Sequence, residues 1–267
     1  MEISSTERKR FRMDLAYDGR PFSGWQSQAG GKTVQDSLLE AIQSICPDVS
    51  TIQGSGRTDA GVHAERQVAH FDAPADWRMN GGEWQKALNS KLPASVRVVL
   101  CGEVNPEFHS RFSALEKEYR YTIATGDVLH PLEVGVVWHQ RNLSLGDEWE
   151  EILSLFQGNH DFRAFSANRN DGKDEDRDTN RTIFEASIDR LSPAKAIISF
   201  RGNGFLYKMV RFLVGTAVYC MRDRITQKEI AKLLEGEVRG RKAPYCAPPD
   251  GLVLYRVTYP QEFEIFD

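Results

Sequence analysis

The sequence predicts an α/β protein of the α+β type, built from two domains with mostly antiparallel mixed sheets flanked by helices. Short segments that alternate apolar with polar residues, typical of half-buried strands, are interleaved with amphipathic helical stretches. The second half of the chain repeats this order. The 267 residues, 40% of them hydrophobic, are enough for two cores, which we place in residues 1–110 and 111–267.

The first half opens with a predicted strand over residues 11–17 that ends at Asp18-Gly19. Thr33 is then a predicted helix N-cap, because Asp36 follows it in a near capping box. The apolar residues of that helix form one stripe: Val34, Leu38, Ala41, Ile42 and Ile45. The remaining expected elements are strands at 68–71 and 96–100 and a short helix around 83–89.

The second half begins with a predicted strand marked by the alternating Tyr119, Tyr121 and Ile123. Thr226 and Glu229 predict a capped helix that ends near Gly236. The other expected elements are a helix over 149–156 that Gly158 terminates, a strand pair at 183–188 and 196–201, a helix over 205–221 and a last strand at 252–259. The polar stretch 167–180 is expected to be a mobile surface loop.

Charge and cysteine content narrow the classes of function. The net charge of −4 argues weakly against nucleic acid, but basic residues cluster between 201 and 224, so a basic face is possible on an acidic protein. The four Cys and six His are scattered without close pairs, which predicts free thiols in a reducing compartment and no metal site. We find neither a signal peptide nor an apolar run long enough for a membrane span, and therefore expect a soluble cytoplasmic protein.

The most informative stretch runs over residues 54–64, Gly-Ser-Gly-Arg-Thr-Asp-Ala-Gly-Val-His-Ala. Its glycines allow unusual backbone dihedral angles and close approach to a ligand. A Gly-rich turn is the simplest interpretation, and a phosphate cradle is another, although the lysine of a Walker motif is absent. On this ground alone, the function of the stretch stays open.

Several motifs in order resemble the TruA family of tRNA pseudouridine synthases. Residues 57–63, Arg-Thr-Asp-Ala-Gly-Val-His, resemble the core of that family's signature. Matching motifs lie on both sides of it, in the order 17–19, 22–26, 33–35, 87–89, 92–93, 108–114, 117–121, 205–211 and 247–252. The resemblance therefore covers almost the whole chain.

The resemblance implies an isomerase that breaks the N-glycosidic bond of uridine, turns the base and rejoins it through carbon. No metal, nucleotide or redox cofactor is implied. Asp59 matches the essential family aspartate, and a carboxylate can act as nucleophile or base at a glycosidic centre. Water must be excluded, which favours an enclosed pocket. We expect two related domains that meet in a basic active-site cleft with Asp59 at its floor.

Four further residues take roles by the same resemblance. Arg211 matches the arginine that pairs with the catalytic aspartate, and Arg57 matches the one that occupies the space of the flipped nucleotide. Tyr119 matches the tyrosine that stacks on the target uracil, although an isolated strand tyrosine is more often core. Leu252 would line the pocket. His63 could face RNA or be a structural histidine.

The family acts on uridines at positions 38 to 40 of the tRNA anticodon stem-loop and works as a homodimer, so tRNA and a second copy of the chain are the expected partners. The target uridine must be flipped out of a stem. Three alternatives remain open: the same reaction at other RNA positions, a non-catalytic RNA-binding protein on the same scaffold, and a nucleotide-binding enzyme that uses the Gly-rich loop.

Overall fold

The computed structural model describes residues 7–168, 178–236 and 240–265. The chain divides into two compact units, Met1–Leu115 with Leu254–Asp267, and Glu116–Val253. Unit 1 is thus made of two separate stretches of chain. The sequence-based division into 1–110 and 111–267 stays a prediction, and it does not include a return of the chain to the first unit.

Unit 1 is built on an antiparallel sheet. Strand β1 (Arg8–Tyr17) lies between β3 (His63–Pro74) and β4 (Val96–Val104), and the short β2 (Gln53–Gly54) pairs with the other edge of β3. The strand predicted at 11–17 is confirmed, with three more residues at its start. Its odd-numbered apolar side chains enter the core, but the expectation of a half-buried strand is wrong, because Arg12 and Asp14 on the other face are also buried and form an ion pair.

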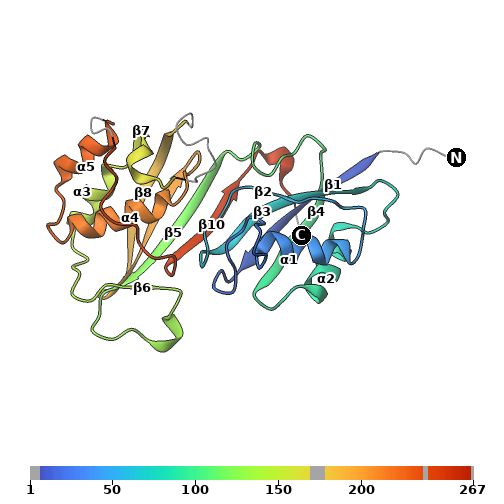
Figure 1. The fold of residues 1–267 in the computed structure, drawn as a ribbon, viewed down its shortest axis with the longest axis horizontal. Helices are drawn as coiled ribbons and strands as arrows, with labels where there is room; N and C mark the ends of the chain where they lie inside the picture. The colour runs from blue at the N-terminus through green and yellow to red at the C-terminus, as the bar shows by residue number, and fades with distance from the viewer. Residues whose placement is uncertain (1–6, 169–177, 237–239, 266–267) are drawn as a thin grey trace. The chain divides into compact units, whose positions relative to one another are not determined.

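Helices α1 (Val34–Gln43) and α2 (Gly81–Lys91) cover this sheet (Figure 1). The predicted cap is confirmed: Thr33 accepts a hydrogen bond from the Asp36 amide. Trp84 of α2 is fully buried, and its ring lies 6.0 Å from that of Phe11 and 5.0 Å from that of Phe71. Burial of three aromatic side chains supplies much of the hydrophobic stabilisation of this unit.

Unit 2 is built on a further set of paired strands. Strand β5 (Glu116–Ala124) pairs antiparallel with β9 (Lys195–Gly202), which pairs with β8 (Asn180–Ser192), which in turn pairs with β7 (Gly158–Asp161). The two-residue β6 (Trp138–His139) runs parallel to β5. The predicted α+β class with mostly antiparallel sheets is confirmed. Strand β10 (Leu252–Thr258) begins in unit 2 and ends in unit 1.

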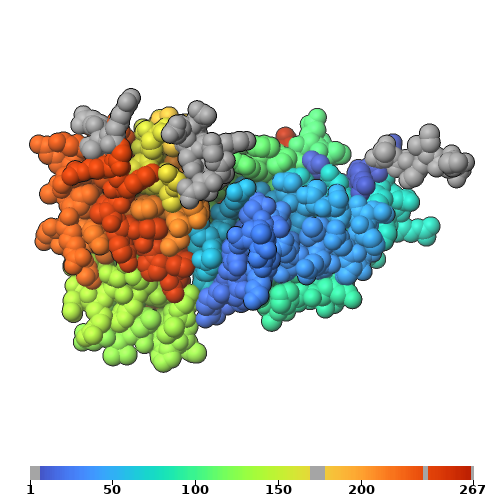
Figure 2. Space-filling view, in the orientation of Figure 1, coloured from blue at the N-terminus to red at the C-terminus, as the bar shows by residue number. Residues whose placement is uncertain are grey.

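The helices of unit 2 are α3 (Glu148–Ser154), α4 (Met209–Cys220) and α5 (Gln227–Leu234), with 3-10 turns η1 (Pro131–Glu133) and η2 (Phe162–Phe165). A third turn, η3 (Gln261–Phe263), belongs to unit 1. The capping box predicted from Thr226 and Glu229 is confirmed. The connection between β5 and β6 lies at the surface of unit 2 (Figure 2), where Val128 is 86% exposed.

Several predicted boundaries are wrong. Helix α4 begins at Met209 rather than at 205, because Lys208 adopts a left-handed backbone conformation with φ of +61° that interrupts a helix. Helix α3 ends at Ser154, and Gly158, with φ of +102°, starts β7 instead of ending the helix. Strand β10 ends one residue before the predicted 259. Most of the predicted loop 167–180 lies outside the described residues.

Candidate active site

Asp59 and Arg57 lie on the loop that connects β2 with β3 in unit 1. The amide of Ser55 donates to the carbonyl of Val68 over 2.7 Å, which continues the β2–β3 pairing into the loop. A tight turn follows, in which the Val62 amide donates to the Asp59 carbonyl over 3.1 Å and Gly61 has φ of +80°. This turn leaves Asp59 half-buried and Arg57 exposed.

The chain segment after β1 packs closely against this loop. The Trp25 amide donates to the Thr58 carbonyl over 3.0 Å. Gly24 has φ of +97°, and a Cβ there would lie 2.7 Å from the same carbonyl oxygen. No other residue type fits this backbone without displacing the residue that precedes Asp59. The 22–26 motif therefore has a structural role in positioning the loop.

A buried network of neutral side chains holds the loop from beneath. Gln67 on β3 accepts from the Ser55 hydroxyl over 2.5 Å and donates to the Gly56 carbonyl over 3.0 Å and to the Tyr17 hydroxyl over 3.5 Å. The Tyr17 and Thr58 hydroxyls are 2.8 Å apart. Burial raises the pKa of Tyr17 to about 12, so the phenol stays protonated. The network thus fixes residues on both sides of Arg57.

The Arg57 side chain is oriented by hydrogen bonds that run through two glutamine side chains. Its Nε donates to the Gln26 side-chain oxygen over 3.1 Å, and the Gln26 nitrogen donates to Gln35 of α1 over 2.6 Å. Gln35 also donates to the Ile52 carbonyl over 2.9 Å. These contacts orient the Arg57 side chain. Because the residue is exposed, its guanidinium is accessible to a ligand.

His63, the last residue of the signature, is only 7% exposed. Its Nδ1 lies 3.3 Å from the Gly19 amide, which donates to it, and 3.3 Å from a carboxylate oxygen of Asp18. A hydrogen bond from Arg20 holds the pKa of Asp18 below its usual value. Because His63 braces the loop after β1, its local contacts match the structural interpretation of this residue.

Tyr119, Arg211 and Leu252 lie in unit 2. Tyr119 on β5 pairs with Phe200 of β9 and is 7% exposed, with its ring 5.0 Å from that of Phe205 in an edge-to-face arrangement. Tyr119 is therefore buried against an aromatic side chain within this unit, as a core tyrosine would be. A stacking role for Tyr119 stays a prediction.

Arg211 on α4 is fastened to the segment 245–252. Its Nε donates to the Ala247 carbonyl over 2.7 Å, and its own carbonyl accepts from the Ala247 amide over 3.0 Å. Tyr121, two residues from Tyr119 on β5, donates its hydroxyl to the Pro248 carbonyl over 2.7 Å. Burial raises the pKa of Tyr121, and the positive charge of Arg211 opposes that shift.

Leu252 follows this segment directly. The Thr122 amide of β5 donates to the Gly251 carbonyl over 2.9 Å, and the Leu252 amide donates to the Pro249 carbonyl over 2.8 Å. Leu252 is 4% exposed. Unit 2 thus brings Arg211, Tyr121 and Leu252 together at the segment 245–252, whereas Arg57 and Asp59 share a loop of unit 1. Sequence reasoning missed Gln67 and Tyr17, which hold that loop.

The chain matches a known protein family. A family model described as tRNA pseudouridine synthase matches residues 15–113 and 152–260. The chain belongs to the tRNA pseudouridine synthase family. The membership predicted from the motifs is confirmed. The two matched ranges include the Asp59 loop, Arg211 and Leu252, while Tyr119 lies between them.

Relatives in this family align over nearly their full length. The chain is 45% identical over 257 residues to tRNA pseudouridine synthase A of Akkermansia muciniphila, covering 95% of this chain and 96% of the relative. It is 38% identical to the protein of the same name from Geobacillus kaustophilus, over 95% and 96% of the two chains. A solved Cbf5-Nop10-Gar1 complex aligns with TM-score 0.37 and 13% identity, covering 78% of this chain and 44% of that chain.

Two further observations concern metals and membranes. Among the described residues, no group of three or more His, Cys, Asp or Glu side chains has an arrangement that could hold a metal ion. No helix in the described part of the chain has the length and apolar character that crossing a membrane requires.

Proposed function

We propose that this chain isomerises uridine to pseudouridine in tRNA, at positions 38 to 40 of the anticodon stem-loop, with Asp59 as the reacting carboxylate. The observation that carries the proposal is the Asp59 loop, which presents a half-buried carboxylate from a backbone fixed by Trp25, Gly24 and the Gln67 network. A carboxylate on a fixed backbone reaches the geometry of reaction at a smaller cost in entropy. Family membership and the names of the relatives support the substrate.

In the proposed reaction, the bond between C1′ of the ribose and N1 of uracil breaks, and a bond between C1′ and C5 forms. The proton on C5 leaves, and N1 gains a proton, so the product is an isomer of the substrate. Asp59 either attacks C1′ as a nucleophile or removes the C2′ proton. An ionised carboxylate serves both routes, and Arg211 is proposed to pair with it and orient it.

The remaining roles concern the substrate. Arg57 is proposed to fill the space left by the flipped nucleotide, which suits an exposed guanidinium on the loop that carries Asp59. Tyr119 and Leu252 are proposed to contact the flipped base. Two copies of the chain are proposed to bind one tRNA in the cytoplasm, and the solution mass of the protein alone and with tRNA tests this stoichiometry.

The decisive experiment maps pseudouridine, nucleotide by nucleotide, in unmodified tRNA incubated with the wild-type chain and with Asp59→Asn. We expect product at positions 38 to 40, and a loss of at least about 1,000-fold in rate for the variant, since the amide is neither nucleophile nor base. Asp76→Asn, which makes the same change at an exposed carboxylate after β3, is the control and should retain full activity.

Each other outcome changes a different part of the proposal. Product at other positions keeps the chemistry and overturns the specificity. Full activity of Asp59→Asn removes Asp59 from the reaction. Binding of tRNA without any product supports a non-catalytic RNA-binding protein instead.

A further inference from the structure

The segment that follows β4 presents an aromatic side chain to solvent. Phe112 is 76% exposed, although large apolar side chains are usually buried. The guanidinium carbon of Arg111, also exposed, lies 5.6 Å from the centre of the Phe112 ring. Arg111 forms no ion pair with any described residue, so its positive charge is not neutralised within that part of the chain. The 108–114 motif has no role in the proposed reaction.

The backbone near Phe112 is held in place at Ser110, which is fully buried. The Ser110 hydroxyl donates to the Gln53 carbonyl over 2.8 Å, and its amide donates to Nδ1 of His70 over 3.2 Å. Its carbonyl accepts from the Tyr259 hydroxyl over 2.5 Å. Three polar atoms of one residue are therefore bound to three different parts of unit 1.

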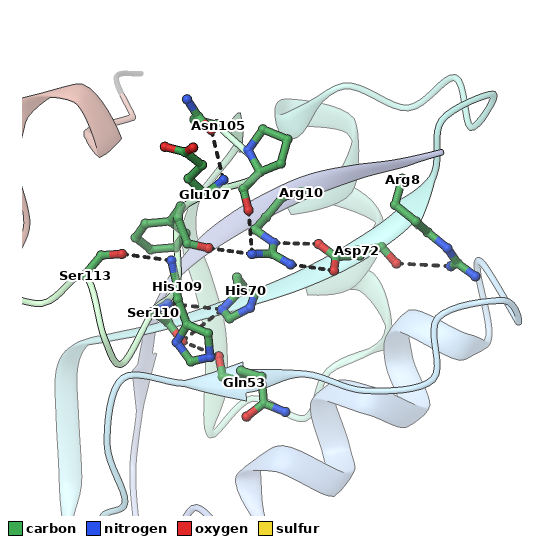
Figure 3. Close-up of polar contacts among 12 residues, drawn as sticks. Arg8, Arg10, Gln53, His70, Asp72, Asn105, Glu107, His109, Ser110 and Ser113 are labelled. Atoms are coloured by element: carbon green, nitrogen blue, oxygen red, sulfur yellow. Dashed lines mark hydrogen bonds and ion pairs between the residues drawn. The ribbon is translucent and has the colours of Figure 1, made fainter. Parts of the chain in front are cut away.

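The residues that precede Ser110 are also held in place. Arg10 donates to the carbonyls of Pro106 and Phe108, each over 2.7 Å, and forms a two-bond ion pair with Asp72 (Figure 3). Because the Asp72 charge is paired with Arg10, it does not offset that of Arg111. The segment is thus ordered before any ligand binds.

His109 supports the Phe112 ring directly. Its Nδ1 accepts from the amides of Arg111 over 3.1 Å and Phe112 over 3.4 Å, and its ring centre lies 4.4 Å from that of Phe112. On its other side, the His109 ring lies 4.8 Å from that of His70. An exposed phenyl ring that is packed in this way loses little entropy when a flat ligand stacks on it.

From this geometry we propose that Phe112 and Arg111 form a contact site for an unpaired nucleotide of the RNA substrate, separate from the reacting carboxylate. The Phe112 ring stacks on the base, and the Arg111 guanidinium contacts a neighbouring phosphate. One rigid aromatic ring beside an unpaired cation is the combination with which proteins bind single-stranded nucleotides without reading their sequence. The choice of RNA as ligand rests on the proposed function.

Unit 2 offers a matched control. Phe184 on β8 is 44% exposed, and the Arg201 guanidinium lies 5.8 Å from its ring centre. Arg201, however, is paired with Glu116 over 2.7 Å and with Glu185 over 3.3 Å. The two sites share an exposed ring next to an arginine, but only Arg111 lacks an ion-pair partner among the described residues. We therefore expect RNA to contact Phe112 and not Phe184.

The experiment measures the Kd for unmodified tRNA of the full chain carrying Asp59→Asn, which stops turnover, alone and combined with a second substitution. Phe112→Ala should raise Kd by about 5- to 100-fold, and Phe112→Trp should restore binding. Arg111→Gln should reduce the slope of log K against log salt by about one. Phe184→Ala should leave Kd unchanged. The thermal midpoints should match, because both rings are exposed.

Three results would overturn the site: an unchanged Kd for Phe112→Ala, an equal loss for Phe184→Ala, or a loss of self-association by Phe112→Ala at unchanged affinity per protomer. The last would assign Phe112 to a protein contact. Failure of the proposed function is distinct, because tRNA binding that depends on Phe112, in a wild-type chain that makes no pseudouridine, removes the reaction and supports the RNA contact.

Discussion

Strand β3 anchors two different loops through two buried polar side chains, Gln67 and His70. In the regular pairing with β1 they lie opposite Leu15 and Arg12, three residues apart, so they face opposite sides of the sheet. Gln67 holds the loop that carries Asp59, and His70 holds the segment that presents Phe112. The same strand therefore orients the proposed reacting group and the proposed RNA contact.

The two anchors differ in their chemistry. The Gln67 amide contacts Ser55, Gly56 and Tyr17 as both donor and acceptor, and it carries no charge at any pH. His70 accepts the Ser110 amide at Nδ1, which is possible only while that nitrogen is unprotonated. The Gln67 anchor of the Asp59 loop thus does not titrate, whereas the His70 anchor of the Phe112 segment does.

Replacing Gln67 with Met should have the largest effect. The side chain keeps its volume but loses its hydrogen bonds to the Ser55 hydroxyl and the Gly56 carbonyl, and a buried polar group that loses a partner costs about 1–3 kcal/mol. We expect the free energy of unfolding to fall by about 3 kcal/mol. Single-turnover rates with saturating tRNA should fall by about 10- to 100-fold, because Asp59 is no longer held in one position.

Asn89→Leu separates the two parts of this effect. The Asn89 amide on α2 bonds the carbonyl and the amide of Val98 over 2.8 and 2.9 Å, away from the Asp59 loop. The substitution should lower the free energy of unfolding, because the carbonyl and amide of Val98 lose these partners. The single-turnover rate should stay at the wild-type value. If Gln67→Met and Asn89→Leu reduce the rate equally, Gln67 has no positioning role.

The second largest effect is the pH dependence of unit 1 stability. Burial, followed by the positive charge of Arg10, lowers the pKa of His70 to about 4 from an ordinary value of 6.5. The unfolded chain therefore binds a proton at higher pH than the folded chain does. Stability from this group is complete above pH 6.5 and is lost as the pH falls towards 4, by about 2 kcal/mol between pH 7.5 and pH 5.

Denaturant unfolding at the two pH values measures this loss. In His70→Asn, the side-chain oxygen replaces Nδ1 as acceptor for the Ser110 amide without a titrating group. The variant should lose about 2 kcal/mol less than the wild-type chain on acidification. An identical loss in both chains would mean that another group is responsible.

The smallest effect is expected for Tyr17→Phe. Removing the hydroxyl breaks the contact with Thr58 and one donor interaction of Gln67, at a cost of about 1 kcal/mol in stability. Because Gln67 keeps its bonds to Ser55 and Gly56, the single-turnover rate should fall by less than about tenfold. Since burial raises the pKa of Tyr17 to about 12, wild-type stability should show no loss from this group up to pH 10. A rate loss as large as that of Gln67→Met would make Tyr17 the main support of the loop.

Local sequence signals predicted much of the fold. Thr33 and Thr226 identify helix starts because the capping partner lies three residues away, and alternation identifies β1 because its apolar side chains share one face of the strand. The start of α4 was missed because the left-handed conformation of Lys208 has no sequence signature in a residue that rarely adopts it.

The residues of the candidate site also fall into those that a local sequence signal reveals and those that it does not. Asp59 and Arg57 were recognisable from a continuous motif, and Arg211 from a second one. Gln67 was not, because within a strand it is one polar residue among others, and its partner Tyr17 lies 50 positions away. Contacts of this kind become visible only when the register of β1 against β3 is known.

The divided course of unit 1 has a consequence for synthesis on the ribosome. Tyr259 binds the Ser110 carbonyl, and the carbonyl of Phe263 accepts from Arg12 over 2.8 Å, so residues made late complete contacts of residues made early. Unit 2 is continuous from Glu116 to Val253, so all of its residues are synthesised before Tyr259 and Phe263. The chain of unit 2 is therefore fully synthesised before that of unit 1, and the Ser110 carbonyl gains its Tyr259 partner only after residue 259 has left the ribosome.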